Sequence, residues 1–233
     1  MTPPTPSPSV QRRPRAVHAA WLLVAMLPFR GTAIPLQGQT GKMAPPVDTT
    51  GLAEGPWASM EMLYERTIFN VDIFRLHLTF GPETADSLQA LAAGRRYDGA
   101  LADSLAHVAL RSRNVLVRTR FLRDVGLDQF LDGLRDNLRN AREEGLLTRE
   151  EEETIARETA EQYAPLADRG IREGETMWYR IRGDSLHVAF QARDGSVPVE
   201  QRPVGPERRL SVMAGYLAPG SEFREKLLRS LFR

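Results

Sequence analysis

The sequence contains no cysteine among its 233 residues. This absence excludes disulfide bonds, thiolate nucleophiles and cysteine-ligated metal centres. Histidine is also scarce, and no two of the four histidines have the HxxxH spacing that places two metal ligands on one face of a helix. They are His18, His77, His107 and His187. The sequence therefore predicts neither a metal site nor a cofactor.

Charge of one sign is not in excess either. The chain has 31 lysines and arginines against 30 acidic residues, and the arginines are spread over several segments. A tract of basic residues, which would favour binding to a phosphate backbone, is missing, so no nucleic-acid partner is expected. With 42% hydrophobic and 26% charged residues, the composition is that of a globular protein rather than a disordered chain or a membrane bundle.

Only one long apolar run occurs, and it lies near the N-terminus. Residues 17–29, VHAAWLLVAMLPF, follow a proline-rich segment with three arginines and precede the small residues Gly31 and Ala33. This order is typical of a signal peptide, and the run is too short to span a membrane comfortably. We expect a signal peptide over 1–33, a periplasmic or secreted bacterial protein, and no stable membrane span after cleavage. The alternative is a single amphipathic anchor or an uncleaved tether.

The folded domain is expected to begin after a linker. Residues 34–56 are rich in Gly, Pro, Gln and Thr and show no apolar period, which is typical of a flexible linker. The remaining residues, 57–233, are of a length that one hydrophobic core can serve. We therefore expect one folded domain over this range.

Three segments have the composition of β-strands. Residues 67–79 and 114–125 are rich in β-branched and aromatic side chains, and residues 175–192 contain two alternating runs about the turn Gly183–Asp184. The last pattern predicts a β-hairpin that buries one face. The face that it leaves more exposed carries Arg180, Arg182 and His187.

Six segments have helical periodicity. Thr148 and Glu151 form a capping box at the start of one of them, and Ser221 is a candidate N-cap for the last. The expected helices span residues 83–93, 97–110, 127–144, 148–168, 208–217 and 221–232. Together with the strands, they predict an α+β fold in which helices cover one side of an antiparallel sheet.

Four stretches, taken in order, resemble the chalcone isomerase family, which also includes fatty-acid-binding members and bacterial proteins. They are the strand IFNVDIF, the helix QFLDGLRDNL, the segment FQARDGSVP and the tail GSEFREKLLRSLF. The resemblance covers about Tyr64 to Phe232. It implies a chalcone isomerase-like fold with a cleft between sheet and helices.

The resemblance also implies where the polar groups of the family's cleft should lie. The family's catalytic threonine matches Asn70 and its tyrosine matches Phe130, whereas its asparagine is kept as Asn137. Phenylalanine can neither donate nor accept a hydrogen bond. The family's arginine has no equivalent between Gly41 and Glu65. Arg66, Arg75, Arg118, Arg120 and Arg123 are possible substitutes.

Three functions remain open from the sequence. The first is binding of a small apolar ligand, such as a fatty acid or polyketide that can carry a carboxylate for an arginine to meet. Its expected contacts are Asn70, Phe74, Arg120, Phe130, Leu134 and Asn137. The second is an intramolecular lyase that closes a ring on an enone, an isomerase of the chalcone isomerase type. The third is a structural or interaction module of the cell envelope.

Overall fold

A computed structural model describes residues 43–66 and 71–232. The expected signal peptide and the first part of the expected linker lie outside these residues, as does Asn70. Within the described part, no helix is both long and apolar enough to cross a membrane.

In the described part of the chain, six antiparallel strands form one sheet, in which each strand pairs with the next along the chain. They are β1 (Ser59–Arg66), β2 (Val71–Phe80), β3 (Asn114–Phe121), β4 (Thr176–Arg182), β5 (Ser185–Gln191) and β6 (Val199–Gln201). The sequence analysis missed the two edge strands. In β1, methionine, glutamate and leucine favour helices as much as strands, and β6 has only three residues.

The β4–β5 hairpin agrees with the sequence pattern. Ile181 pairs with Leu186 on either side of the turn, where Gly183 adopts a φ of 61°. Left-handed backbone of this kind is accessible to glycine without a steric penalty. The inward side chains of the hairpin are buried in the main core: Met177, Tyr179, Ile181, Leu186, Val188 and Phe190.

The helices also follow the expected order. They are α1 (Pro82–Ala92), α2 (Gly99–Leu110), α3 (Leu127–Glu143), α4 (Arg149–Tyr163), α5 (Pro206–Leu217) and α6 (Arg224–Ser230). The capping box of Thr148 and Glu151 is confirmed at the start of α4. Ser221 is not the N-cap of α6, because this helix begins at Arg224 and its N-cap is Phe223. The Ser221 hydroxyl donates to the Gly215 carbonyl at 2.7 Å and accepts from the Phe223 N–H at 3.3 Å.

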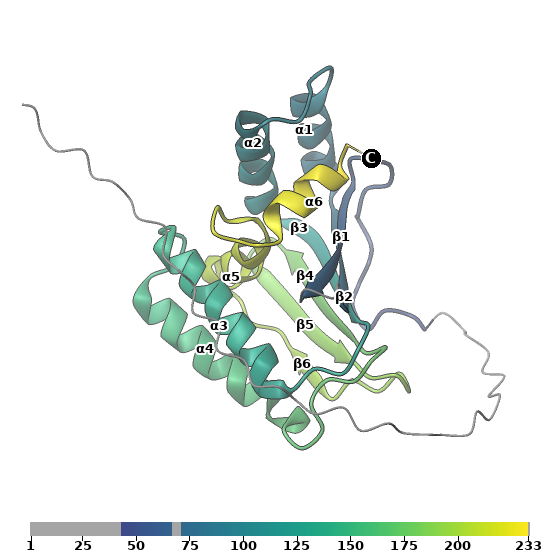
Figure 1. The fold of residues 1–233 in the computed structure, drawn as a ribbon, viewed down its shortest axis with the longest axis vertical. Helices are drawn as coiled ribbons and strands as arrows, with labels where there is room; N and C mark the ends of the chain where they lie inside the picture. The colour runs from purple at the N-terminus through teal and green to yellow at the C-terminus, as the bar shows by residue number, and fades with distance from the viewer. Residues whose placement is uncertain (1–42, 67–70, 233) are drawn as a thin grey trace, which may run out of the picture. The chain divides into compact units, whose positions relative to one another are not determined.

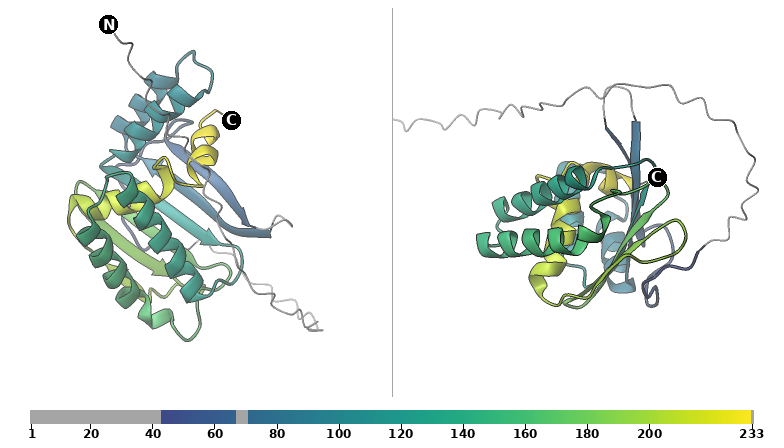
Figure 2. Two further views of the ribbon diagram at one scale, coloured as in Figure 1. Left: turned by 60° about the vertical axis from the view of Figure 1, so that its left-hand side comes forward. Right: turned by 90° about the horizontal axis from the view of Figure 1, so that it is seen from below.

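Helices α3, α4 and α5 lie on one side of the sheet (Figures 1 and 2). We call this side the inner face. The α+β class, with an antiparallel sheet that helices cover on one side, is confirmed. The main core lies between this face and the helices, and a second apolar cluster ties α3, α4 and α5 to one another.

The opposite side of the sheet, the outer face, is partly covered by residues 44–53, which we call the strap. Val47 is only 6% exposed and packs with Leu116, Trp178 and Ala189. At the two ends of the strap, Gln191 donates to the Ala44 carbonyl at 3.1 Å and Ala53 donates to the Phe80 carbonyl at 2.8 Å. These residues belong to the segment that the composition assigned to a linker, and their contacts begin the packed unit well before residue 57.

Arg180 departs from the exposure expected for its hairpin face, since it is only 3% exposed. Its guanidinium donates to the carbonyls of Asp48 at 2.7 Å and Thr50 at 2.9 Å in the strap, and to those of Val115 and Ile181 at 3.2 and 2.7 Å in the sheet. The strap therefore buries this arginine. Arg182 is the next residue on the same strand face toward the turn. Its side chain stays half-exposed and binds Thr50 and Asp48.

Candidate functional site

A cavity of about 70 Å³ lies between the β4–β5 hairpin and helices α3, α4 and α5. Its apolar lining comes from all of these elements: Leu134 and Leu138 of α3, Ile155 of α4, Leu186 and Val188 of β5, and Val212 of α5. This is the region between sheet and helices where the sequence analysis expected a ligand cleft.

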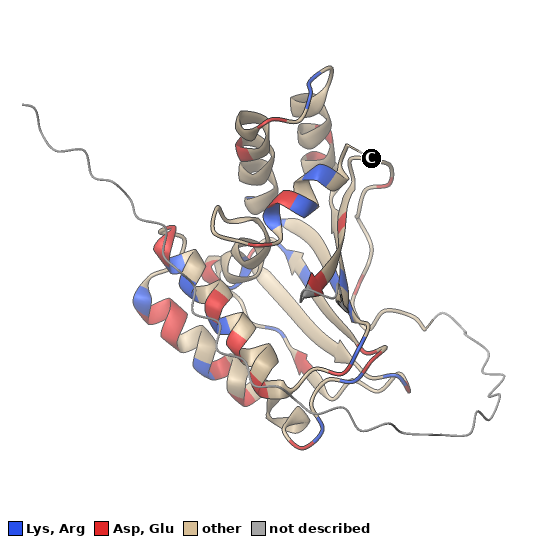
Figure 3. Cartoon of the chain, viewed as in Figure 1, with Lys and Arg blue, Asp and Glu red and all other residues tan. Residues whose placement is uncertain are grey.

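Helix α3 supplies Leu134 and Asn137 to the cavity because they share one side of the helix, three residues apart. The outward side of α3 is held by ion pairs along the helix, such as Arg135 with Asp132 at 2.7 Å. Figure 3 shows these charges as alternating blue and red along α3 and α4. The charge pattern thus keeps the apolar side of α3 turned toward the sheet.

Three tyrosines bring hydroxyl groups to the cavity: Tyr163 at the end of α4, Tyr179 in β4 and Tyr216 in α5. The Tyr163 hydroxyl donates to the sulfur of Met177 at 2.9 Å. Burial raises the pKa of Tyr216 to about 12 and raises the pKa values of Tyr163 and Tyr179 well above that of a free tyrosine. All three hydroxyls are therefore protonated at any physiological pH, and that of Tyr163 already donates a hydrogen bond to Met177.

Asn137 is the polar group of α3 at the cavity. Its amide makes no hydrogen bond with any described residue, so it can serve a ligand or a water molecule. Gly215 of α5 makes this position possible, because a Cβ atom there would lie 3.2 Å from the Cβ and Nδ2 atoms of Asn137. The close approach of α3 and α5 thus depends on glycine at 215.

Among the described residues that line the cavity, Arg208 is the one with a charged side chain, and it is already neutralised. Its guanidinium is 2.7 Å from a carboxylate oxygen of Glu158 and 3.5 Å from one of Glu207. No group of three or more His, Asp or Glu side chains within 43–66 and 71–232 is placed to hold a metal ion. The cavity is thus apolar with uncharged hydrogen-bonding groups.

The structure places the expected site residues in three different settings. Leu134 and Asn137 line the cavity. Phe130 packs behind it, with the centre of its ring 5.1 Å from that of Tyr163. Phe74 stacks on Tyr64 at 4.8 Å and is joined to Phe130 through Phe121, which contacts both rings. Asn70 lies outside the described residues.

Arg120 is not brought to the cavity. In β3, Thr119 and Phe121 are buried on the inner face, so the alternation of side chains along the strand turns Arg120 to the outer face, where it is exposed. An apolar ligand between sheet and helices cannot reach this arginine. The correction follows from strand periodicity alone.

The sequence analysis missed the three tyrosines as site residues. The alternation of the hairpin already put Tyr179 on the buried face, and the helical period put Tyr163 on the inner side of its helix. A tyrosine hydroxyl usually finds a partner when it is buried, so two buried tyrosines in one predicted core were a usable signal. Tyr216 lies in a helix whose inward side the sequence did not define.

No protein-family model matches the sequence, and no curated protein matches it either. Among solved structures, the chain is similar to the crystal structure of a fatty-acid binding protein of Arabidopsis thaliana, with a TM-score of 0.49 and 10% sequence identity. The similarity covers 82% of this chain and 95% of that chain. A likeness at this level defines neither a family nor a ligand.

Proposed function

We propose that the chain binds a small, largely apolar ligand in the cavity between the β4–β5 hairpin and helices α3–α5. The observation that carries the proposal is an apolar lining with a few uncharged polar side chains at one place, those of Asn137 and the three tyrosines. Ligand sites in proteins typically combine an apolar wall with a small number of orienting polar groups.

The size of the cavity indicates how such a ligand would enter. A volume of about 70 Å³ is well below the roughly 300–1,000 Å³ of typical ligand pockets. An extended hydrocarbon chain therefore requires the α3–α4 pair to move away from the sheet.

The charges at the cavity favour a ligand whose polar end is neutral or weakly polar. Arg208 is occupied by Glu158, and Arg120 is on the other face of the sheet. A carboxylate would thus meet hydrogen-bond donors but no free guanidinium among the described lining residues. We expect a fatty alcohol or ester to bind at least as well as the fatty acid of the same chain length.

The test uses the purified full chain after extraction of bound lipids. Displacement of a fluorescent fatty-acid probe, cis-parinaric acid, measures binding, and mass spectrometry of the extract identifies copurified molecules. Leu134→Trp fills the cavity and should weaken probe binding about tenfold or more, since a few lost apolar contacts suffice for that factor. Val204→Trp makes the same kind of change at a residue that is 70% exposed and should leave binding unchanged.

The binding proposal fails if the wild-type chain shows no saturable probe binding, or if L134W binds the probe as well as V204W does. Circular dichroism and the midpoint of thermal unfolding establish that both variants are folded. A comparison of hexadecanol with palmitate as competitors then tests the preference for a neutral polar end.

We also propose that the chain is exported. The basic and apolar leader supports this proposal, and it lies outside the described residues. Fractionation of cells that express the full chain, followed by N-terminal sequencing of the mature protein, is the test. A mature protein that begins near residue 34 is the expected result, and retention of the intact chain in the cytoplasm would contradict it.

A further inference from the structure

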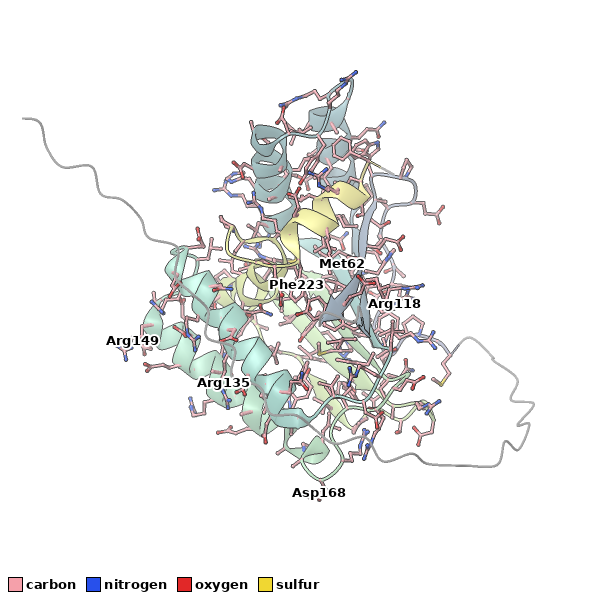
Figure 4. All side chains as sticks on the ribbon, viewed as in Figure 1. Met62, Arg118, Arg135, Arg149, Asp168 and Phe223 are labelled. Atoms are coloured by element: carbon pink, nitrogen blue, oxygen red, sulfur yellow. The ribbon has the colours of Figure 1, made fainter. Side chains whose placement is uncertain are left out.

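Three arginines lie together on the outer face of the sheet: Arg75 of β2, and Arg118 and Arg120 of β3. We call them the arginine patch. Arg75 lies more than forty residues before Arg118 and Arg120 in the sequence, which is why the sequence shows no basic tract. Figure 4 shows Arg118 beside β2, away from the helices that carry Arg135 and Arg149.

The strand register brings like charges face to face. Arg75 pairs directly with Arg120, and His77 pairs with Arg118. Directly opposed residues in an antiparallel pair have Cα atoms about 4.5–5.5 Å apart, and like charges in that position destabilise the sheet. His77 has Glu61 at 3.8 Å, but no described acid forms an ion pair with any of the three arginines.

Two common structural reasons for cations on a sheet do not apply to the arginine patch. Charged side chains often protect edge strands from pairing with other chains, yet β2 and β3 are interior strands of the six. Cross-strand pairs usually place an acid opposite an arginine, whereas this sheet places arginine opposite arginine. The arrangement costs stability in the absence of an anion.

The surroundings of the patch add a second observation. The strap covers Leu116, Trp178 and Ala189 but leaves Arg75 and Arg120 exposed. Trp178 pairs across the strands with Arg118, whose guanidinium carbon lies 5.9 Å from the centre of the indole ring. Trp178 is only 8% exposed, and its indole N–H has no hydrogen-bond partner among the described residues. A buried donor with no described partner therefore lies beside Arg118, and no described acid pairs with any of the three arginines.

We propose that the arginine patch binds a phosphate group, either of a soluble phosphomonoester or of a lipid headgroup. Guanidinium groups bind phosphate oxygens in a bidentate manner, and the Arg75–Arg120 spacing lets both side chains reach one phosphate. Arg118 is two residues from Arg120 on the same strand face, about 7 Å away, and can meet a further oxygen. Three cations that form no ion pair with a described acid suit a dianion better than a carboxylate.

The test compares two double variants of the full chain that remove the same charge. Arg75→Gln with Arg120→Gln changes the patch, and Arg95→Gln with Arg96→Gln changes two exposed neighbouring arginines elsewhere. The midpoint of thermal unfolding is followed against inorganic phosphate, with sodium chloride added to hold the ionic strength constant. Isothermal titration with glycerol 3-phosphate measures affinity.

Phosphate should raise the unfolding midpoint of the wild-type chain and of R95Q/R96Q, but not that of R75Q/R120Q. Affinity should fall about tenfold to a hundredfold in R75Q/R120Q, as expected for lost charge-assisted hydrogen bonds. Without phosphate, R75Q/R120Q should unfold at a higher temperature than the wild type, because the opposed charges are gone. A structural role for these arginines predicts the reverse.

The proposal would be overturned if phosphate raised the unfolding midpoint equally in all three proteins. It would also be overturned if R75Q/R120Q without phosphate unfolded at a lower temperature than the wild type. The single variant Arg118→Gln serves if the double variant does not fold, with a smaller loss of affinity expected. Sedimentation with phosphatidylcholine vesicles, with and without phosphatidic acid, distinguishes the sources. Preference for phosphatidic acid vesicles supports a lipid headgroup, binding of the soluble phosphates alone supports a free phosphomonoester, and binding of neither refutes the patch.

Discussion

The two faces of the sheet are built from the same alternating strands, yet they are covered in different ways. Helices α3–α5 cover the inner face with an apolar layer, and the cavity with its three tyrosines lies within that layer. On the outer face, the ten residues of the strap cover β3–β5, and a buried arginine holds them through backbone carbonyls. The inner face is thus stabilised mainly by the burial of apolar surface, and the outer face by a few directed hydrogen bonds.

The largest effect is expected from the inner face. Phe190 of β5 is fully buried beside Phe121 and Tyr163, so Phe190→Ala should lower the free energy of unfolding by about 4 kcal/mol. Urea denaturation measures the loss. His187→Ala, on the outer face of the same strand, removes only a partly exposed contact with Glu200 and should cost less than about 1 kcal/mol. Similar losses for the two variants would remove the distinction between the faces.

On the outer face, Arg180→Met should be the most damaging substitution of a charged residue. It removes the donors for four carbonyl groups, two in the strap and two in the sheet, and we expect a loss of about 3 kcal/mol in the free energy of unfolding. Arg182→Met is the matched control, because its side chain is half-exposed and contacts the same strap residues. Hydrogen exchange of the strap amides should increase in R180M. If R182M loosens the strap as much as R180M does, the burial of Arg180 is not what holds it.

The smallest effect is expected for the stability of the fold at acidic pH. The backbone N–H of Thr50 donates to the Asp48 carboxylate at 2.8 Å and, with the Thr50 hydroxyl, lowers the pKa of Asp48 below its usual value of 3.8. A carboxylate with a lowered pKa stabilises the fold above the pKa of the unfolded chain, and this stabilisation is lost as the pH falls through the folded value. Asp48→Asn should therefore flatten the fall in stability between about pH 4 and pH 2, followed by circular dichroism. An unchanged acid profile would mean that Asp48 takes no part in holding the strap.

Local sequence patterns predicted the elements whose cause is local. The hairpin about Gly183, the capping box of Thr148 and the apolar side of α3 all depend on residues within a few positions of one another. Strand alternation even placed Arg120 opposite the buried side chains of β3, although the ligand prediction did not apply it. The fold class followed from the order of these elements.

Features that depend on distant segments could not be predicted in the same way. Arg180 is buried by residues about 130 positions earlier, and their composition indicated a linker. The arginine patch exists only because the β2–β3 register brings Arg75 and Arg120 together. The tyrosine group of the cavity likewise needs α4, β4 and α5 in one place. A single sequence contains all the residues of such sites but does not show which of them come together.

The hydrogen bonds from Arg180 to the strap also imply an order of events during folding. Arg180, whose side chain binds Thr50, is synthesised about 130 residues after Thr50. The sheet carbonyls that its guanidinium also binds are in place only when β3 pairs with β4. Contacts between such distant residues form slowly, because a long loop must close before they contribute. The earliest part of the packed unit to be synthesised is therefore among the last to reach its final position.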